Sequence, residues 1–302
     1  MSSTNAGRGG IEWPTLGLIA ACYMVWTLSV GPLWSAFAPF AFVLATLSIA
    51  LFSSLQHEIL HGHPFRSRAL NEALVFPGFT LVVPYVRFRD THLAHHRDEF
   101  LTDPYDDPES NYLDPAIWER LSRPMRRLLR MNNTLAGRML LGPAISTVAF
   151  VRSDWCAIRG GDRKVRDAWV LHAIGVAMVL AWLLAFGAMP VWAYVLAAYA
   201  AYGMLKIRTF LEHRAHEKAR GRSVVIEDRG PLAFLFLNNN FHAVHHAHPR
   251  VAWYRLPALY AERREQVLAR NEGYRYGSYS EVFRKHLFRA KDPVPHPLMR
   301  QD

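Results

Sequence analysis

Long apolar blocks alternate with polar stretches along this chain. No Asp, Glu, Lys or Arg occurs between Glu12 and Glu58, and none occurs between Asp167 and Lys206. A helix needs about 20 apolar residues to cross a bilayer, so each charge-free block is long enough for two spans and a tight turn. The pattern predicts an all-α integral membrane protein with four transmembrane helices in two hairpins.

Glycine and proline mark the two turns, at Gly31-Pro32 and at Gly187–Pro190. They place the predicted spans at about residues 15–30, 35–55, 168–186 and 191–205. The first turn carries no charge, whereas polar sequence is abundant at the other ends of the spans. By the positive-inside rule, those other ends and both termini face the cytoplasm. We therefore expect a bacterial inner-membrane protein whose polar side forms a cytosolic helical cap.

The chain divides into a predicted disordered tail (1–12), a membrane domain (13–257) and a basic C-terminal cytosolic segment (258–302). A signal peptide is the alternative for the first apolar region, because Ala36-Phe37-Ala38 resembles a cleavage site. However, the apolar region before that site is longer than the usual h-region of about 7–15 residues. A retained first span is the better interpretation.

Two further segments are apolar but do not read as spans. Residues 69–86 contain Glu72, two prolines and a glycine, which favours a short interfacial or re-entrant segment. Residues 135–151 are interrupted by Arg138, which favours an amphipathic helix lying on the membrane.

Charge and cysteine content limit which binding partners and which kinds of metal site are expected. The net charge of +10 is explained by basic residues beside spans, or else by a surface that docks an acidic electron-transfer protein. Nucleic-acid binding is not expected in a chain with this much membrane. The two cysteines, Cys22 and Cys156, lie in different kinds of region and imply neither a disulfide framework nor a thiolate metal site.

Histidines cluster at the polar ends of the predicted spans. The spacing H-x-x-H-H occurs twice, and a histidine pair four residues apart follows the second span. Positions i, i+3 and i+4 share a helix face, so the three imidazoles of each box are expected to point at one spot. The candidate metal ligands are His57, His61, His92, His95, His96, His213, His242, His245 and His246.

Nine imidazoles exceed the four ligands of a zinc site and suit two metal ions with four or five nitrogens each. Imidazole without thiolate suits iron, zinc, copper or nickel, and spacing alone does not choose among them. His57-Glu58-Ile59-Leu60-His61 also matches the H-E-x-x-H helix of zinc proteases, a remote alternative that leaves both H-x-x-H-H boxes unexplained. A further alternative is a histidine-rich membrane protein that binds or transports metal without redox chemistry. Transport would favour polar groups near the bilayer midplane, whereas these histidines cluster at span ends and in loops.

Together the three boxes and the two hairpins resemble the membrane fatty acid desaturase and hydroxylase superfamily, from the first span to about Pro257. This resemblance implies a non-haem di-iron centre on the cytosolic side that uses O2 as co-substrate. It also implies a lipid or acyl substrate and an external electron donor of ferredoxin, rubredoxin or cytochrome type. Family members carry a further histidine after the fourth span, often as Glu-His. Glu212-His213 stands there, and His216 is a rival for the same role.

The resemblance favours desaturation of an acyl chain in a lipid or acyl thioester. The alternative is a hydroxylase or ketolase of a lipid, alkane or carotenoid on the same fold. The segment His245-His246-Ala247-His248-Pro249 is similar to membrane alkane hydroxylases, whereas Phe210–Arg214 is similar to carotenoid ketolases and acyl desaturases.

Several polar residues beside the boxes are candidates for orienting the ligands rather than binding the metal. Asp98 and Asp103 are acidic candidates in the loop after the second box, where solvated acids are equally expected. The other candidates are Glu58, Glu212, His216, Asn238, His63 and His248.

Overall fold

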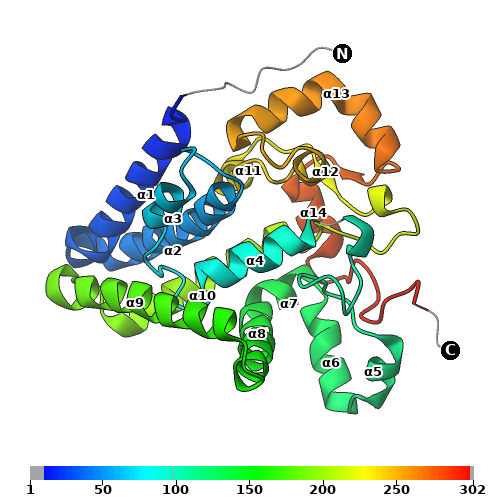
Figure 1. Ribbon diagram of the computed structural model, residues 1–302, viewed down its shortest axis with the longest axis horizontal. Coiled ribbons are helices and arrows are strands. Elements are labelled where there is room, and N and C mark those ends of the chain that lie inside the picture. The colour runs from blue at the N-terminus through cyan, green and yellow to red at the C-terminus, as the bar shows by residue number, and fades with distance from the viewer. Residues whose placement is uncertain (1–9, 97, 300–302) are drawn as a thin grey trace.

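The computed structural model describes residues 10–96 and 98–299, and this part of the chain is mostly helical (Figure 1). Two short strands pair in parallel, β1 (Val225–Ile226) with β2 (Arg275–Tyr276). The predicted tail of residues 1–12 falls largely on residues 1–9, which lie outside the described residues. The helices are α1 (Trp13–Val30), α2 (Pro32–Leu60), α3 (Arg68–Leu74), α4 (Tyr85–His95), α5 (Pro115–Arg120), α6 (Arg123–Asn132), α7 (Leu135–Leu140), α8 (Gly142–Arg159), α9 (Arg163–Phe186), α10 (Val191–Thr209), α11 (Pro231–Leu235), α12 (His242–Ala247), α13 (Leu256–Arg270) and α14 (Tyr279–His286), with 3-10 turns at Asp98–Phe100, Ala219–Gly221 and Trp253–Arg255.

Three of these helices, α1, α2 and α9, are long and apolar enough to cross a membrane. They contain the first three predicted spans. Helix α2 is 29 residues long and continues past the predicted end of its span to Leu60. A helix that is long and apolar enough to cross a membrane therefore carries His57 in its last turn.

Helix α10 covers the fourth predicted span but does not match the other three in hydropathy. Its last turn contains Lys206 and Arg208, and its buried residues include Tyr194 and Ala197. Much of its apolar surface packs against α2 in the hydrophobic core of the protein. A fourth membrane crossing remains a prediction.

The turn between α1 and α2 and the turn between α9 and α10 contact each other directly. The carbonyl oxygen of Val30 accepts hydrogen bonds from the backbone N–H groups of Ala188 and Met189, at 2.8 and 2.9 Å. Deeper in the bundle, the Trp26 indole donates to the Tyr194 hydroxyl at 3.1 Å. Both turns therefore lie at the same end of these helices, and the other ends of α2 and α10 lie on the side of the histidines.

Residues 69–86 and 135–151, the two apolar segments that are not expected to be spans, do not form single long helices. Residues 69–86 form the short helix α3 and then irregular chain, which packs so closely on α9 that a Cβ on Gly175 would lie 2.6 Å from the Phe76 carbonyl oxygen. The predicted helix over residues 135–151 is divided into α7 and α8 at Leu141. Arg138, expected on a polar helix face, is instead buried and donates to the Asn132 carbonyl oxygen at 3.1 Å.

The chain after α10 forms the cap over the histidine end of the helices. In Figure 1, α4 lies near the centre of the molecule, with α13 and α9 on opposite sides of it. Strand β1 contacts α12, and β2 joins β1 to the C-terminal helix α14. This arrangement places the third histidine box opposite the first two.

Candidate metal centre

The end of α2 supplies the first two imidazoles. His57 lies in the last turn of the helix and His61 follows as its C-cap, four residues later, so both project from one face. Their ring centroids are 5.0 Å apart. Glu58, between them, turns away and accepts a hydrogen bond from the Trp253 backbone N–H at 3.0 Å. It does not occupy the general-base position of a zinc protease.

Each H-x-x-H-H box divides its imidazoles between two groups, instead of pointing all three at one spot. In α4, His92 and His96 face the α2 histidines while His95 faces the other way. In α12, His245 joins the α2 histidines while His242 and His246 form part of the second group. The helix explains this, because positions i+3 and i+4 are about 100° apart around the axis. Adjacent imidazoles can thus serve two neighbouring sites.

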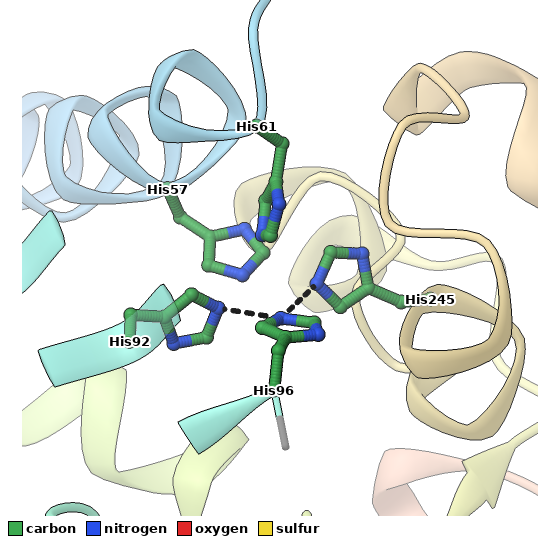
Figure 2. A group of neighbouring side chains, drawn as sticks. All are labelled: His57, His61, His92, His96 and His245. Atoms are coloured by element: carbon green, nitrogen blue, oxygen red, sulfur yellow. Dashed lines mark hydrogen bonds between the residues drawn. The ribbon is translucent and has the colours of Figure 1, made fainter. Parts of the chain in front are cut away.

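The first group contains five histidines whose ligand nitrogens all lie within 4.8 Å of one another. Figure 2 shows the rings converging from α2, α4 and α12. The Nε2 atom of His96 lies 3.0 Å from that of His92 and 3.2 Å from that of His245. The members of this group are His57, His61, His92, His96 and His245.

The second group contains four histidines within the same 4.8 Å limit. His213, on the segment that follows α10, has its Nε2 atom 2.9 Å from that of His95 and 3.0 Å from that of His242. The rings of His96 and His246 stack at 4.2 Å between centroids, which sets the two groups side by side. The members of this group are His95, His213, His242 and His246.

Two carboxylates behind the second box orient its imidazoles, and neither was singled out from the sequence. His95 Nδ1 donates to Asp107 at 2.7 Å, and His92 Nδ1 donates to Glu109 at 3.1 Å. A hydrogen bond at Nδ1 leaves Nε2 free to face a metal. The signal in the sequence was the acidic turn after the box, which reverses the chain and returns its carboxylates to the helix. Asp103 caps that turn instead, accepting from the Tyr105 backbone N–H.

A third carboxylate, the buried Glu212, acts through an asparagine. Asn239 donates to Glu212 at 2.9 Å, and its amide oxygen accepts from His242 Nδ1 at 3.3 Å. The predicted residue, Asn238, has a positive φ and donates to the Trp253 carbonyl oxygen. The positive φ turns the Asn238 side chain away, and its neighbour Asn239 takes the place beside His242.

The remaining predicted histidines lie outside both groups. His216 lies near the surface, where its Nε2 is 3.4 Å from Glu272. His63 donates to Glu12 at 2.7 Å and has its other nitrogen 3.8 Å from Glu58. His248 follows α12 and lines a small cavity behind His246. The geometry therefore brings His213, and not His216, to the cluster.

Electrostatics keep most of these imidazoles in the neutral form that binds metal. Burial, followed by the influence of neighbouring imidazoles, lowers the pKa of five of the nine: His61, His96, His213, His242 and His245. Burial also acts on His95, but Glu109 and Asp107 outweigh it and raise the pKa of His95 to about 9. A neutral imidazole is the ligating form.

The donor set fits two metal ions. The Nε2 atoms of His57 and His61 are buried without a hydrogen-bond partner, which is costly unless something outside the protein binds them. Groups of five and four imidazoles match the expected two ions with four or five nitrogens each. No thiolate is close, since Cys22 is buried within α1 and Cys156 is exposed on α8. The nine imidazoles are more than the four ligands that a single zinc ion normally takes.

Comparison with known families gives one match. A model of the fatty acid desaturase family matches residues 32–278, from the start of α2 to Ser278. The matched stretch contains all nine histidines of the two groups. No curated protein matches the chain.

Proposed function

Because the chain belongs to the fatty acid desaturase family, we propose that it is an O2-dependent di-iron membrane oxidoreductase that desaturates an acyl chain of a lipid or acyl thioester. One observation carries the proposal: nine imidazoles form two adjacent groups, of five and four, at the end of the membrane helices. The first group and the second would each hold one iron ion.

The residues of the chain have distinct tasks in this proposal. The nine histidines hold the metal ions, and Asp107, Glu109 and Asn239 fix the tautomer and direction of the rings behind which they lie. When bound, two non-haem irons supply the oxygen activation needed to remove hydrogen from an unactivated C–H bond. Helix ends from distant parts of the chain fix the spacing of the two groups.

A cavity of about 620 Å³ opens beside the second group and supports a substrate site there. His95 and His213 are part of its wall, together with residues of α2, α4, α8 and α10. Pockets of this size typically bind a small-molecule ligand, and this one could also hold part of a longer chain. Substrate carbons in this cavity would lie next to the metal ligands.

The topology and the partners complete the proposal. We place α10 as a fourth span beside the three apolar helices, with both termini and the metal centre in the cytoplasm of a bacterial cell. The positive-inside rule supports this orientation, because Lys206 and Arg208 lie in the last turn of α10, at the end nearest the metal centre, and further basic residues come after them. Electrons would come from an external ferredoxin, rubredoxin or cytochrome.

Product analysis tests the reaction. Lipids from cells expressing the wild type are compared by mass spectrometry with those from cells expressing a His245→Ala, His246→Ala variant. Loss of two hydrogen atoms from an acyl chain, in the wild type only, is the expected result. A gain of one oxygen atom would identify a hydroxylase instead. His216→Ala is the matched control, because His216 lies outside both groups, and it should keep the activity.

A further inference from the structure

The wall of the cavity beside the second histidine group is mixed, with apolar residues and five Lys or Arg side chains. Most of them have an acidic partner. Arg87 binds Asp154 at 2.8 Å, Arg208 lies 3.1 Å from Glu212, and Lys291 lies 3.3 Å from Asp292. The two other acids of the wall, Asp107 and Glu109, face the imidazoles of the second box.

Arg138 and Lys206 have no carboxylate partner among the ion pairs of the described residues. Arg138 is 7% exposed and bonds only neutral groups, namely the Asn132 carbonyl oxygen and the side chains of Asn111 and Asn133. Burial lowers the pKa of Arg138 to about 10, the direction expected when a charge lacks a counter-ion. Lys206 lies over the Tyr202 ring, with Nζ 4.6 Å from its centroid.

Both side chains line the same cavity, on helices α7 and α10 that pack together. An uncompensated buried charge such as that of Arg138 is costly, and a second positive charge in the same cavity raises that cost. Metal ions on the nearby histidines would add further positive charge. The cavity is therefore built to receive a negative group.

The C-terminal segment forms part of the wall of this cavity. After α14, the Leu113 backbone N–H donates to the Val294 carbonyl oxygen at 3.0 Å, and the His296 N–H donates back to Leu113 at 2.8 Å. These contacts bring Lys291 over the cavity, where its ammonium group donates to the His213 carbonyl oxygen. Lys291 lies beyond residue 278, where the match to the desaturase family ends. One of the five basic side chains of the cavity is thus supplied by a part of the chain outside the family match.

We propose that Arg138, Lys206 and Lys291 form a subsite for an anionic group of the substrate, a carboxylate or a phosphate, and hold it beside His95 and His213. This proposal rests on the proposed function, because it takes the cavity to be the substrate site. The substrate is then an amphiphile whose charged group enters the protein near the metal centre. An uncharged hydrocarbon or carotenoid would leave Arg138 and Lys206 without a counter-ion.

Ligand binding tests the subsite. The full chain, loaded with iron in phosphatidylcholine nanodiscs, is titrated calorimetrically with dodecanoate, dodecyl phosphate and dodecanol, and empty nanodiscs correct for partitioning. We expect either anion to bind more tightly than dodecanol, and the tighter of the two identifies the group. Lys206→Met should weaken anion binding about tenfold, the loss expected for one hydrogen bond to a charged group, and leave dodecanol unchanged.

The matched control is Lys218→Met, which removes the same charge from a side chain that is 57% exposed outside the cavity. It should change neither affinity. Lys291→Met is a second test if Lys206→Met lowers the thermal unfolding midpoint. Equal wild-type affinities for anions and dodecanol, or equal effects of Lys206→Met and Lys218→Met, would overturn the subsite. Iron content measured on the same samples separates this failure from that of the di-iron proposal, which falls if the wild type binds no iron.

Discussion

The Nδ1 atom of His95 lies 2.7 Å from the Asp107 carboxylate, and both side chains are only 2% exposed. The pair joins a helical box to a loop 12 residues later in the chain. Asp107 is itself held by the backbone N–H groups of Thr102 and Glu109, at 2.8 and 2.9 Å. Its position is therefore fixed before any metal binds, and it directs Nε2 of His95 toward the second group.

Asp107→Asn should weaken metal binding in the second group. The amide keeps the size of the side chain but removes the negative charge that fixes the His95 tautomer, and such partners change metal affinity by about 10–100-fold. Iron retained per chain after dialysis against a chelator measures the effect. Asp103→Asn is the control from the same loop, because Asp103 bonds only backbone N–H groups of its own turn. Equal iron loss in both variants would contradict an orienting role for Asp107.

His213→Ala should remove one of two bound metal ions, whereas His216→Ala should remove none. His213 has its Nε2 atom within 3.0 Å of two other imidazole nitrogens, and His216 is near the surface beside Glu272. Metal content of the purified variants, measured by mass spectrometry, decides between them. Loss of metal from His216→Ala alone would assign the ligand to His216.

Eight of the nine grouped histidines can be predicted as ligands from the sequence because their spacing is local, whereas His213 follows only from the resemblance, with His216 as its rival. Ligands at i, i+3 and i+4 of a helix and the charge-free blocks before them are short-range patterns, which a chain shows without its tertiary structure. The division into five and four is not local, because it depends on which face of α12 meets α2 and which meets the segment after α10.

The orienting residues were harder to predict for the same reason. Asp107 and Glu109 reach the second box only because the loop after α4 folds back, and acids in a turn-rich stretch more often face solvent. Asn239, and not Asn238, lies beside His242, in a turn where Leu237 and Asn238 both have a positive φ. The backbone conformation of the turn decides such contacts, and composition does not reveal it.

Asp154→Ala should destabilise the protein substantially. Asp154 is 2% exposed and accepts from Arg87 at 2.8 and 2.9 Å and from the Trp169 indole at 2.9 Å, so it joins α8 to α4 and α9. Removing one partner of a buried pair leaves the other charge uncompensated, at a cost of about 3–5 kcal/mol. The thermal unfolding midpoint of the purified protein reports the loss.

Asp167→Ala is the control for that experiment. Asp167 also pairs with an arginine, Arg166, but its side chain is 62% exposed. Exposed pairs contribute about 0–1 kcal/mol, so the unfolding midpoint should scarcely change. If Asp154→Ala and Asp167→Ala shifted the midpoint equally, the buried pair would not be what holds α4 in place.

Glu227 should make the stability of the cap depend on pH. It follows β1 and accepts from Arg264 at 2.6 Å and from Tyr260 at 2.5 Å, both on α13, and it also pairs with Arg275 on β2. Burial raises the pKa of Glu227, but these partners outweigh it and lower that pKa to about 2. Since the folded-state pKa lies below the ordinary value of 4.5, the contribution of Glu227 to stability is fully present above pH 4.5 and is lost as the pH falls toward 2.

Glu227→Gln measures this contribution. At neutral pH the variant should unfold at a lower temperature than the wild type, because the amide cannot pair with the arginines. The difference between the two midpoints should stay constant from neutral pH down to about pH 5 and then narrow as the pH falls further. Glu262→Gln, on the same α13 with a side chain that is 63% exposed, should show no such difference. A gap that widened with acid would mean that Glu227 is protonated in the folded protein, contrary to its contacts.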